Sequence, residues 1–187
     1  ATEVSGGRPA CVIVKHNNPC GVALGATSLD AYRGAFAGDP VSAFGAIIVF
    51  TAPVDLETAQ ALSEQFVEVV VSPEFSPEAL ELLSQKPNLR VMQDEERRLR
   101  ATRELDIRQV DGGLLVQEQD TVIAEPDELE VVTEREPTLE EWRDLAFAWR
   151  VCRHVKSNAI VLARGEATVG IGAGQMSRVD SVKIAVE

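Results

Sequence analysis

The segment Cys11-Val12-Ile13-Val14-Lys15-His16-Asn17-Asn18-Pro19-Cys20-Gly21 joins an apolar run to a polar run. Four consecutive apolar residues indicate a short buried strand. The proline and the glycine that follow predict a turn, into which the strand delivers a cation, a base and two amides. Each of these residues alone is typical of an ordinary surface turn, but the seven residues from Lys15 to Gly21 together favour a ligand site at a strand end.

Similar apolar runs recur through the first half of the chain, and segments with helical spacing separate them. Further strands are expected at residues 46–50, 67–71 and 89–92. Helices are expected to begin at three residues of types that commonly cap helices: Ser28, Asp55 and Ser76. Apolar strands that alternate with helices indicate an α/β sheet covered on both faces, so the expected fold is a layered α/β/α sheet.

The middle of the chain predicts a change of organisation. Residues 94–108 are charged and lack clear periodicity, so we expect a surface connection whose arginines pair with neighbouring acids. These arginines are Arg97, Arg98, Arg100 and Arg103. Short strands are expected at residues 108–110, 114–117 and 121–123. Residues 124–137 are acidic and contain two prolines, which is typical of a linker and indicates a boundary near Pro137.

The clearest helix signal lies directly after this boundary. Thr138 and Glu141 match a capping box, in which each side chain satisfies a free backbone donor near the other residue. Apolar residues at helical spacing follow, and we expect this stripe to face the core: Leu139, Trp142, Leu145, Ala146, Trp149 and Cys152. A pair of strands is expected at 159–163 and 167–170, with a final helix after Gly174-Gln175.

Composition restricts the class of protein. With 187 residues, 45% of them hydrophobic and 26% charged, the chain has an ordinary globular composition. No apolar stretch reaches the roughly 20 residues needed to span a bilayer, and the first residues do not resemble a secretory signal. We therefore expect a soluble cytoplasmic protein that is not exported and does not bind membranes.

The cysteines and the net charge exclude other classes. Cys11, Cys20 and Cys152 are odd in number and form no C-x-x-C pair, which disfavours a disulfide framework and a structural zinc site. A net charge of −12 disfavours a nucleic-acid surface, because binding to the phosphate backbone needs a basic face. An anionic small molecule remains compatible with the charge where a few cations converge.

Six motifs, in the same order over nearly the whole chain, resemble those of the AICAR transformylase part of the bifunctional purine-biosynthesis family. They are KHNNPCG at 15–21, DPVSAFG at 39–45, FVEVV at 66–70, DGGLLVQ at 111–117, VKSNAIV at 155–161 and GIGAGQMSRV at 170–179. Relatives commonly have a second glycine where this chain has Ala46. Ordered matches of this extent are far more specific than any single motif.

The resemblance implies an enzyme of IMP biosynthesis that transfers a formyl group from the co-substrate 10-formyltetrahydrofolate to the 5-amino group of AICAR. It implies a cytidine-deaminase-like fold, small-molecule partners and a homodimer. Residues 1–135 would form the first transformylase subdomain, partial at its start, and residues 136–187 the beginning of a second. The parent protein would also contain an IMP cyclohydrolase domain outside this chain. We expect the 187-residue polypeptide alone to be inactive, because it lacks the segment that holds much of the folate site.

The resemblance also implies roles for individual residues. Histidine is the natural general base because it changes charge near neutral pH, and the family assigns proton transfer to the positions of His16 and Lys15. Asn158 would orient the substrate and form hydrogen bonds in the transition state. Five further positions match substrate-binding residues: Phe44, Gly45, Glu68, Gln175 and Arg178.

Three alternatives accompany this interpretation. The signature of zinc-dependent base deaminases is half matched, but Asn18 stands at the glutamate position and Ala23 at the second cysteine. We therefore expect no zinc. The glycines at 170–174 resemble a dinucleotide-binding turn, which is a weak signal without a downstream acid. A non-catalytic module that only binds a nucleotide is the third alternative.

Overall fold

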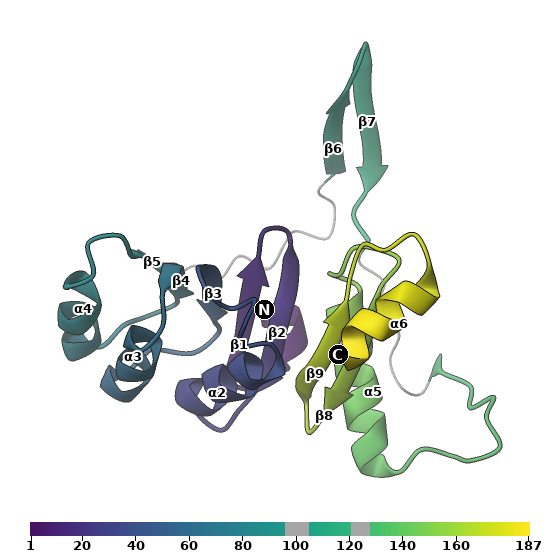
Figure 1. Cartoon of the computed structure of the whole chain (residues 1–187), viewed down its shortest axis with the longest axis horizontal. Coiled ribbons are helices and arrows are strands. Elements are labelled where there is room, and N and C mark those ends of the chain that lie inside the picture. The colour runs from purple at the N-terminus through teal and green to yellow at the C-terminus, as the bar shows by residue number, and fades with distance from the viewer. Residues whose placement is uncertain (96–104, 121–127) are drawn as a thin grey trace.

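The computed structural model describes residues 1–95, 105–120 and 128–187. A mixed sheet of seven strands dominates it, in the order β5-β4-β3-β1-β2-β9-β8 (Figure 1). Its strands are β1 (Ala10–Lys15), β2 (Asn18–Leu24), β3 (Ala46–Phe50), β4 (Val67–Ser72), β5 (Arg90–Gln93), β8 (Ile160–Arg164) and β9 (Ala167–Gly172). β3, β4 and β5 are parallel, and the other neighbours are antiparallel. An α/β fold is confirmed.

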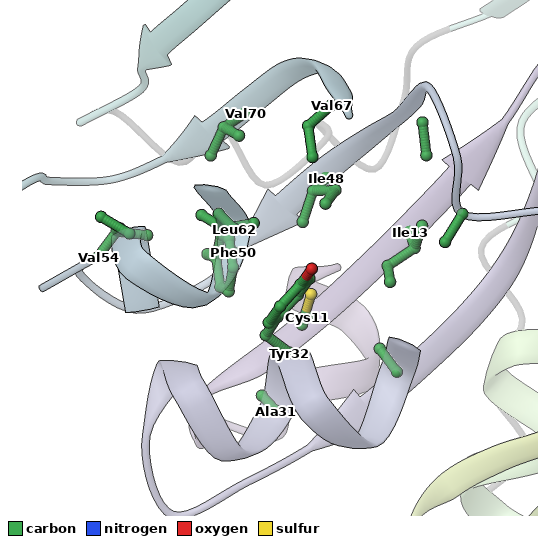
Figure 2. Packing of buried hydrophobic residues seen from close by; sticks show 14 of the residues in the cluster. Cys11, Ile13, Ala31, Tyr32, Ile48, Phe50, Val54, Leu62, Val67 and Val70 are labelled. Carbon is green, nitrogen blue, oxygen red and sulfur yellow. The ribbon is translucent and has the colours of Figure 1, made fainter. Parts of the chain in front are cut away.

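Helices flank both faces of this sheet. They are α1 (Thr2–Ser5), α2 (Ser28–Gly38), α3 (Leu56–Ser63), α4 (Pro77–Ser84), α5 (Leu139–Cys152) and α6 (Arg178–Val186). The main core joins α2, α3 and α4 to β1, β3 and β4, and Figure 2 shows Tyr32 of α2 beside Cys11 of β1. A second core, which includes Val4, Val22, Phe147 and Val151, joins α1 and α5 to the opposite face.

The expected strand pair after the boundary at Pro137 is confirmed, and it completes the same sheet. β9 pairs with β2 through Ala23 and Ala167, and Val22 N donates to Thr168 Oγ1 at 2.9 Å. Residues on both sides of the boundary therefore share one sheet. The division into subdomains at 1–135 and 136–187 stays a prediction.

The expected turn at residues 19–21 is wrong. Pro19, Cys20 and Gly21 lie in β2, and the turn consists of only His16 and Asn17, because Lys15 already pairs with Asn18. Pro19 lies opposite Val14 where the register of the ladder shifts, a place that tolerates the missing N–H of proline. Gly21 is required by packing, since a Cβ there would lie 2.1 Å from Ala35 O of α2.

The helix caps are largely as expected, with one correction. Asp55, Ser76 and Thr138 are N-caps, and the capping box of Thr138 with Glu141 is confirmed. The N-cap of α2 is Thr27 and not Ser28. The Ser28 hydroxyl is directed elsewhere and donates to Pro53 O at 2.7 Å, which ties the start of α2 to the loop before α3.

The expected core face of α5 is wrong. Leu139, Leu145 and Trp149 are 80%, 51% and 58% exposed, whereas Phe147 and Val151 are buried. Phe147 and Val151 are also one helical turn apart, so α5 has two apolar stripes. Packing against α1 and the sheet selects the second stripe.

A separate hairpin forms in the middle of the chain, from β6 (Leu105–Val110) and β7 (Gly113–Glu118). It extends away from the main sheet in Figure 1. β6 begins within the expected surface connection, three residues before the expected strand, so that part of the prediction is wrong. The arginine group at 97–103 and the strand expected at 121–123 lie outside the described residues. No helix in the described part of the chain is long and apolar enough to cross a membrane.

Candidate functional site

Most of the polar residues that were predicted to form a site lie at one end of the sheet. β1 ends at Lys15 and β2 begins at Asn18, while the neighbouring β3 begins after Gly45 and is antiparallel to β1. Because β9 runs antiparallel to β2, its last residue, Gly172, lies at this same end. The chain then passes through Gln175 to α6. The candidate site is therefore built from turns that adjacent strands bring together.

His16 forms the tip of the turn between β1 and β2. Its φ is 55°, in the left-handed region that residues other than glycine adopt only rarely, although histidine is found there more often than most. The residue is exposed, and no hydrogen bond between described residues uses its side chain. An exposed imidazole that has no partner among the described residues is accessible to a ligand for proton transfer.

Lys15 holds the loop that precedes β3. Its ammonium donates to Phe44 O at 2.5 Å and to Gly45 O at 3.2 Å. Gly45 has a φ of 65°, and its N–H donates to Phe66 O at 2.8 Å. The predicted site residues Lys15, Phe44 and Gly45 are thus in direct contact. Lys15 therefore holds the main chain of this loop in place, in addition to any catalytic role.

An aromatic pair borders this loop. The rings of Phe44 and Phe66 have centroids 5.2 Å apart, and the residues are 62% and 43% exposed. Exposed, paired aromatic rings provide an apolar surface against which a planar base can pack. Phe66 was not expected as a site residue, although it begins the 66–70 motif. Its position directly before β4 and two residues before the expected acid Glu68 could have indicated a role in the site.

Asn158 lies in the turn before β8 and is fixed by the connection from β9 to α6. Its Nδ2 donates to Gln175 O and to Met176 O, both at 2.9 Å, and its backbone N–H donates to Gln175 O at 3.1 Å. Both hydrogens of the side-chain amide are therefore occupied. The amide oxygen Oδ1 remains available to accept a hydrogen bond from a substrate. The predicted residues Asn158 and Gln175 are brought into contact.

A further hydrogen bond links the two halves of the site. Asn18 Oδ1 accepts from the backbone N–H of Lys156 at 2.9 Å, which joins the turn that carries His16 to the turn that carries Asn158. Asn18 belongs to the segment 15–21 that favours a ligand site, but neither residue of this contact was assigned a catalytic or substrate-binding role from sequence. Two predicted residues are not brought into contact with the others: the side chains of Glu68 and Arg178 are exposed and form no hydrogen bond or ion pair among the described residues.

A cavity beside the His16 turn is not the candidate site. It has a volume of about 230 Å³ and lies on the face covered by α1 and α5, between Val4, Val12, Pro19 and Val151. Asn17 of the His16 turn lines it, but none of the residues assigned catalytic or substrate-binding roles does. A ligand that contacts His16 and Asn158 would instead bind over the open end of the sheet.

The cysteine of the half-matched zinc signature, Cys20, is a partly buried thiol in β2. Burial, and then the negative charge of Asp39, raise the pKa of the Cys20 thiol to about 11, and a zinc ligand must be a thiolate. The thiol points back to β1, where Sγ lies 3.6 Å from Ile13 O. Among the described residues no three histidine, cysteine or acidic side chains are placed to hold a metal ion. The absence of zinc stays a prediction.

Comparison with known proteins gives a consistent result over the whole chain. Residues 2–187 match the family described as the AICARFT/IMPCHase bienzyme. Two curated proteins, each named Bifunctional purine biosynthesis protein PurH, come from Desulfitobacterium hafniense strains DSM 10664 / DCB-2 and Y51. Each is 52% identical to the chain over 179 residues, which is 96% of this chain and 35% of the relative. The chain thus spans about a third of the length of the curated relatives it matches.

Proposed function

Because the chain belongs to the AICARFT/IMPCHase bienzyme family, we propose that it carries formyl-transfer residues of the AICAR transformylase activity, within a protein of purine biosynthesis. The observation that carries this choice is the link between two turns: the hydrogen bond from Lys156 to Asn18 places the His16 turn beside the Asn158 turn. A general base and an amide acceptor at one open sheet end suit the activation of a weak amine nucleophile.

In the proposed reaction, the 5-amino nitrogen of AICAR attacks the formyl carbon of 10-formyltetrahydrofolate. The new C–N bond forms, the bond from the formyl carbon to N10 breaks, and tetrahydrofolate leaves with a proton on N10. His16 accepts the proton that the amine loses, and Lys15 assists proton transfer while it holds the loop at Phe44 and Gly45. Asn158 accepts an amine hydrogen through Oδ1, since its Nδ2 is already occupied.

The remaining predicted residues have binding roles in this proposal. Phe44 and Gly45 contact the base, and the exposed ring of Phe66 extends the same apolar surface. Glu68 and Gln175 contact the nucleotide. Arg178 begins α6 directly after its N-cap and provides a guanidinium for the phosphate.

We also propose the wider properties of the family for the protein that contains this chain. These are a homodimer in the cytoplasm, an IMP cyclohydrolase activity in a domain outside these residues, and a cytidine-deaminase-like arrangement of the transformylase subdomains. The description of the matching family as a bienzyme supports two activities in the longer protein. The seven-stranded mixed sheet with helices on both faces is compatible with the subdomain proposal.

The decisive experiment uses the full-length protein that contains this chain, assayed with AICAR and 10-formyltetrahydrofolate. His16→Ala should lower turnover by at least the ~10²-fold that a general base contributes. The matched control is His154→Ala, because His154 is the other histidine of the chain and its imidazole contacts Glu3 of α1 at 2.8 Å. An unaltered protein without formyl transfer would refute the proposed function, and normal turnover of His16→Ala would remove His16 from the mechanism.

A further inference from the structure

The turn at residues 156–158 is held firmly on one side. Lys156 O accepts from Gly174 N at 2.8 Å, and Asn158 forms three hydrogen bonds with the 175–176 segment. Ser181 of α6 adds another, from Oγ to Asn158 O at 2.8 Å. These contacts attach the 156–158 turn to the β9–α6 connection and to α6 itself. None of them fixes the position of Asn158 relative to His16.

A single side chain, that of Asn18, connects the 156–158 turn to the part of the site that carries His16. Asn18 follows His16 by two residues, and its Oδ1 accepts from the backbone N–H of Lys156 at 2.9 Å. Among the hydrogen bonds that the described residues form, this one joins the β1–β2 turn directly to the 156–158 turn. Asn18 also pairs with Lys15 at the end of the β1–β2 ladder, so its own backbone is fixed by the sheet.

We propose that Asn18 is a positioning residue, which sets the separation between the imidazole of His16 and the amide of Asn158. This inference rests on the proposed formyl transfer. Asn18 touches no reacting atom in this scheme. It acts through the main chain of Lys156, two residues before Asn158, so a change at Asn18 shifts one half of the site against the other.

The geometry predicts which substitutions the site tolerates. The position needs a short side chain that accepts a hydrogen bond at the distance of Oδ1. Aspartate keeps this oxygen, whereas alanine removes it. The contact is exposed, so its loss should hardly affect global stability, while a displacement of about 1 Å between reacting groups costs up to ~10²-fold in rate.

The test compares Asn18→Ala and Asn18→Asp in the full-length protein, with Asn88→Ala as a matched control from an exposed turn that carries none of the proposed site residues. Asn18→Ala should lower kcat about 10- to 100-fold, with a much smaller change in the KM for AICAR and in the thermal midpoint. Asn18→Asp should retain most of the turnover. Amide hydrogen exchange at Lys156 should become faster in Asn18→Ala and remain slow in Asn18→Asp.

The outcomes separate this inference from the proposed function. An unaltered protein that lacks formyl transfer would refute the proposed function, and the role of Asn18 in that reaction would fall with it. In an active protein, normal kcat for Asn18→Ala would overturn only the positioning role. Equal loss of kcat in the alanine and aspartate variants would also overturn it, because the accepting oxygen would then be irrelevant.

Discussion

The ammonium group of Lys15 donates a hydrogen bond to the carbonyl oxygen of Gly45, 3.2 Å away. Lys15 is the last residue of β1 and Gly45 directly precedes β3, so this contact ties the proposed catalytic strand to the proposed base-binding loop. A second bond, to Phe44 O, makes the same ammonium bridge two consecutive carbonyl groups. Lys15 therefore fixes the conformation of the proposed base-binding loop and also contributes a positive charge to the binding surface.

Replacement of this lysine should impair activity far more than stability. In Lys15→Met the loop at Phe44 and Gly45 loses two charge-assisted hydrogen bonds, and formyl transfer should fall at least about tenfold, which corresponds to roughly 1.4 kcal/mol. Lys86→Met is the comparison variant, since the Lys86 ammonium also bridges two carbonyl groups, those of Ser63 and Gln65, and does not contact the loop at Phe44 and Gly45. Equal losses of turnover in the two variants would contradict a specific role for Lys15.

Gly45 provides a second test of the same loop. Its φ of 65° disfavours any side chain, and an added Cβ would lie 3.3 Å from Lys15 Nζ and 3.4 Å from a ring carbon of Phe66. Gly165, in the turn between β8 and β9, has a similar φ of 60° but open space around the added Cβ. Both alanine variants should lose about 1–2 kcal/mol of stability from the left-handed backbone, as measured by chemical denaturation.

Only Gly45→Ala should also weaken the binding of AICAR, because only there does the methyl group press on Lys15 and Phe66. Calorimetric titration of both variants with AICAR measures this difference. Unchanged affinity in Gly45→Ala would show that the loop does not contact the nucleotide.

The strands that could be predicted from sequence are those whose burial is visible locally. β1 and β3 contain runs of consecutive apolar residues, and β4 contains the run Val69–Val71 after Glu68, as a sheet covered by helices requires. β2 could not be found this way, because Pro19 and Gly21 favour a turn on local grounds. Its extended form depends on pairing with β1 and β9 and on the close approach of Ala35, all of which are tertiary contacts.

The face of α5 and the assembly of the site show the same limit. Helical spacing identified α5, but it could not choose between the stripe with Trp149 and the stripe with Val151, since both are apolar. Motifs identified the turns with His16 and Asn158. The hydrogen bond that joins these turns connects residues 138 positions apart, and no local pattern marks it.

The two hydrogen bonds from Asn158 Nδ2 make the chemistry of this position testable. In Asn158→Asp, a carboxylate would face Gln175 O and Met176 O, both of which are acceptors that now receive amide hydrogens at 2.9 Å. The variant should lose about 1–3 kcal/mol of stability, the usual effect of leaving such partners unsatisfied, and should also lose turnover. Asn88→Asp is the control, and equal thermal midpoints for the two variants would show that the side-chain contacts of Asn158 do not hold the turn.

Cys20 gives a prediction for alkaline pH. Its folded-state pKa is raised from 9.0 to about 11, first by burial and then by the charge of Asp39. Because a raised pKa favours the protonated thiol in the folded state, the resulting stability is fully present below about pH 9 and is lost as the pH rises from there towards 11. The free energy of unfolding should therefore fall less steeply over this range in Cys20→Ala than in the unaltered protein.

Alkylation of Cys20 by iodoacetamide should be slow at pH 8 and accelerate only as the pH approaches 11. Rapid alkylation at neutral pH, or one zinc ion per chain in protein purified without added metal, would instead indicate a thiolate at this position and favour the zinc-dependent alternative.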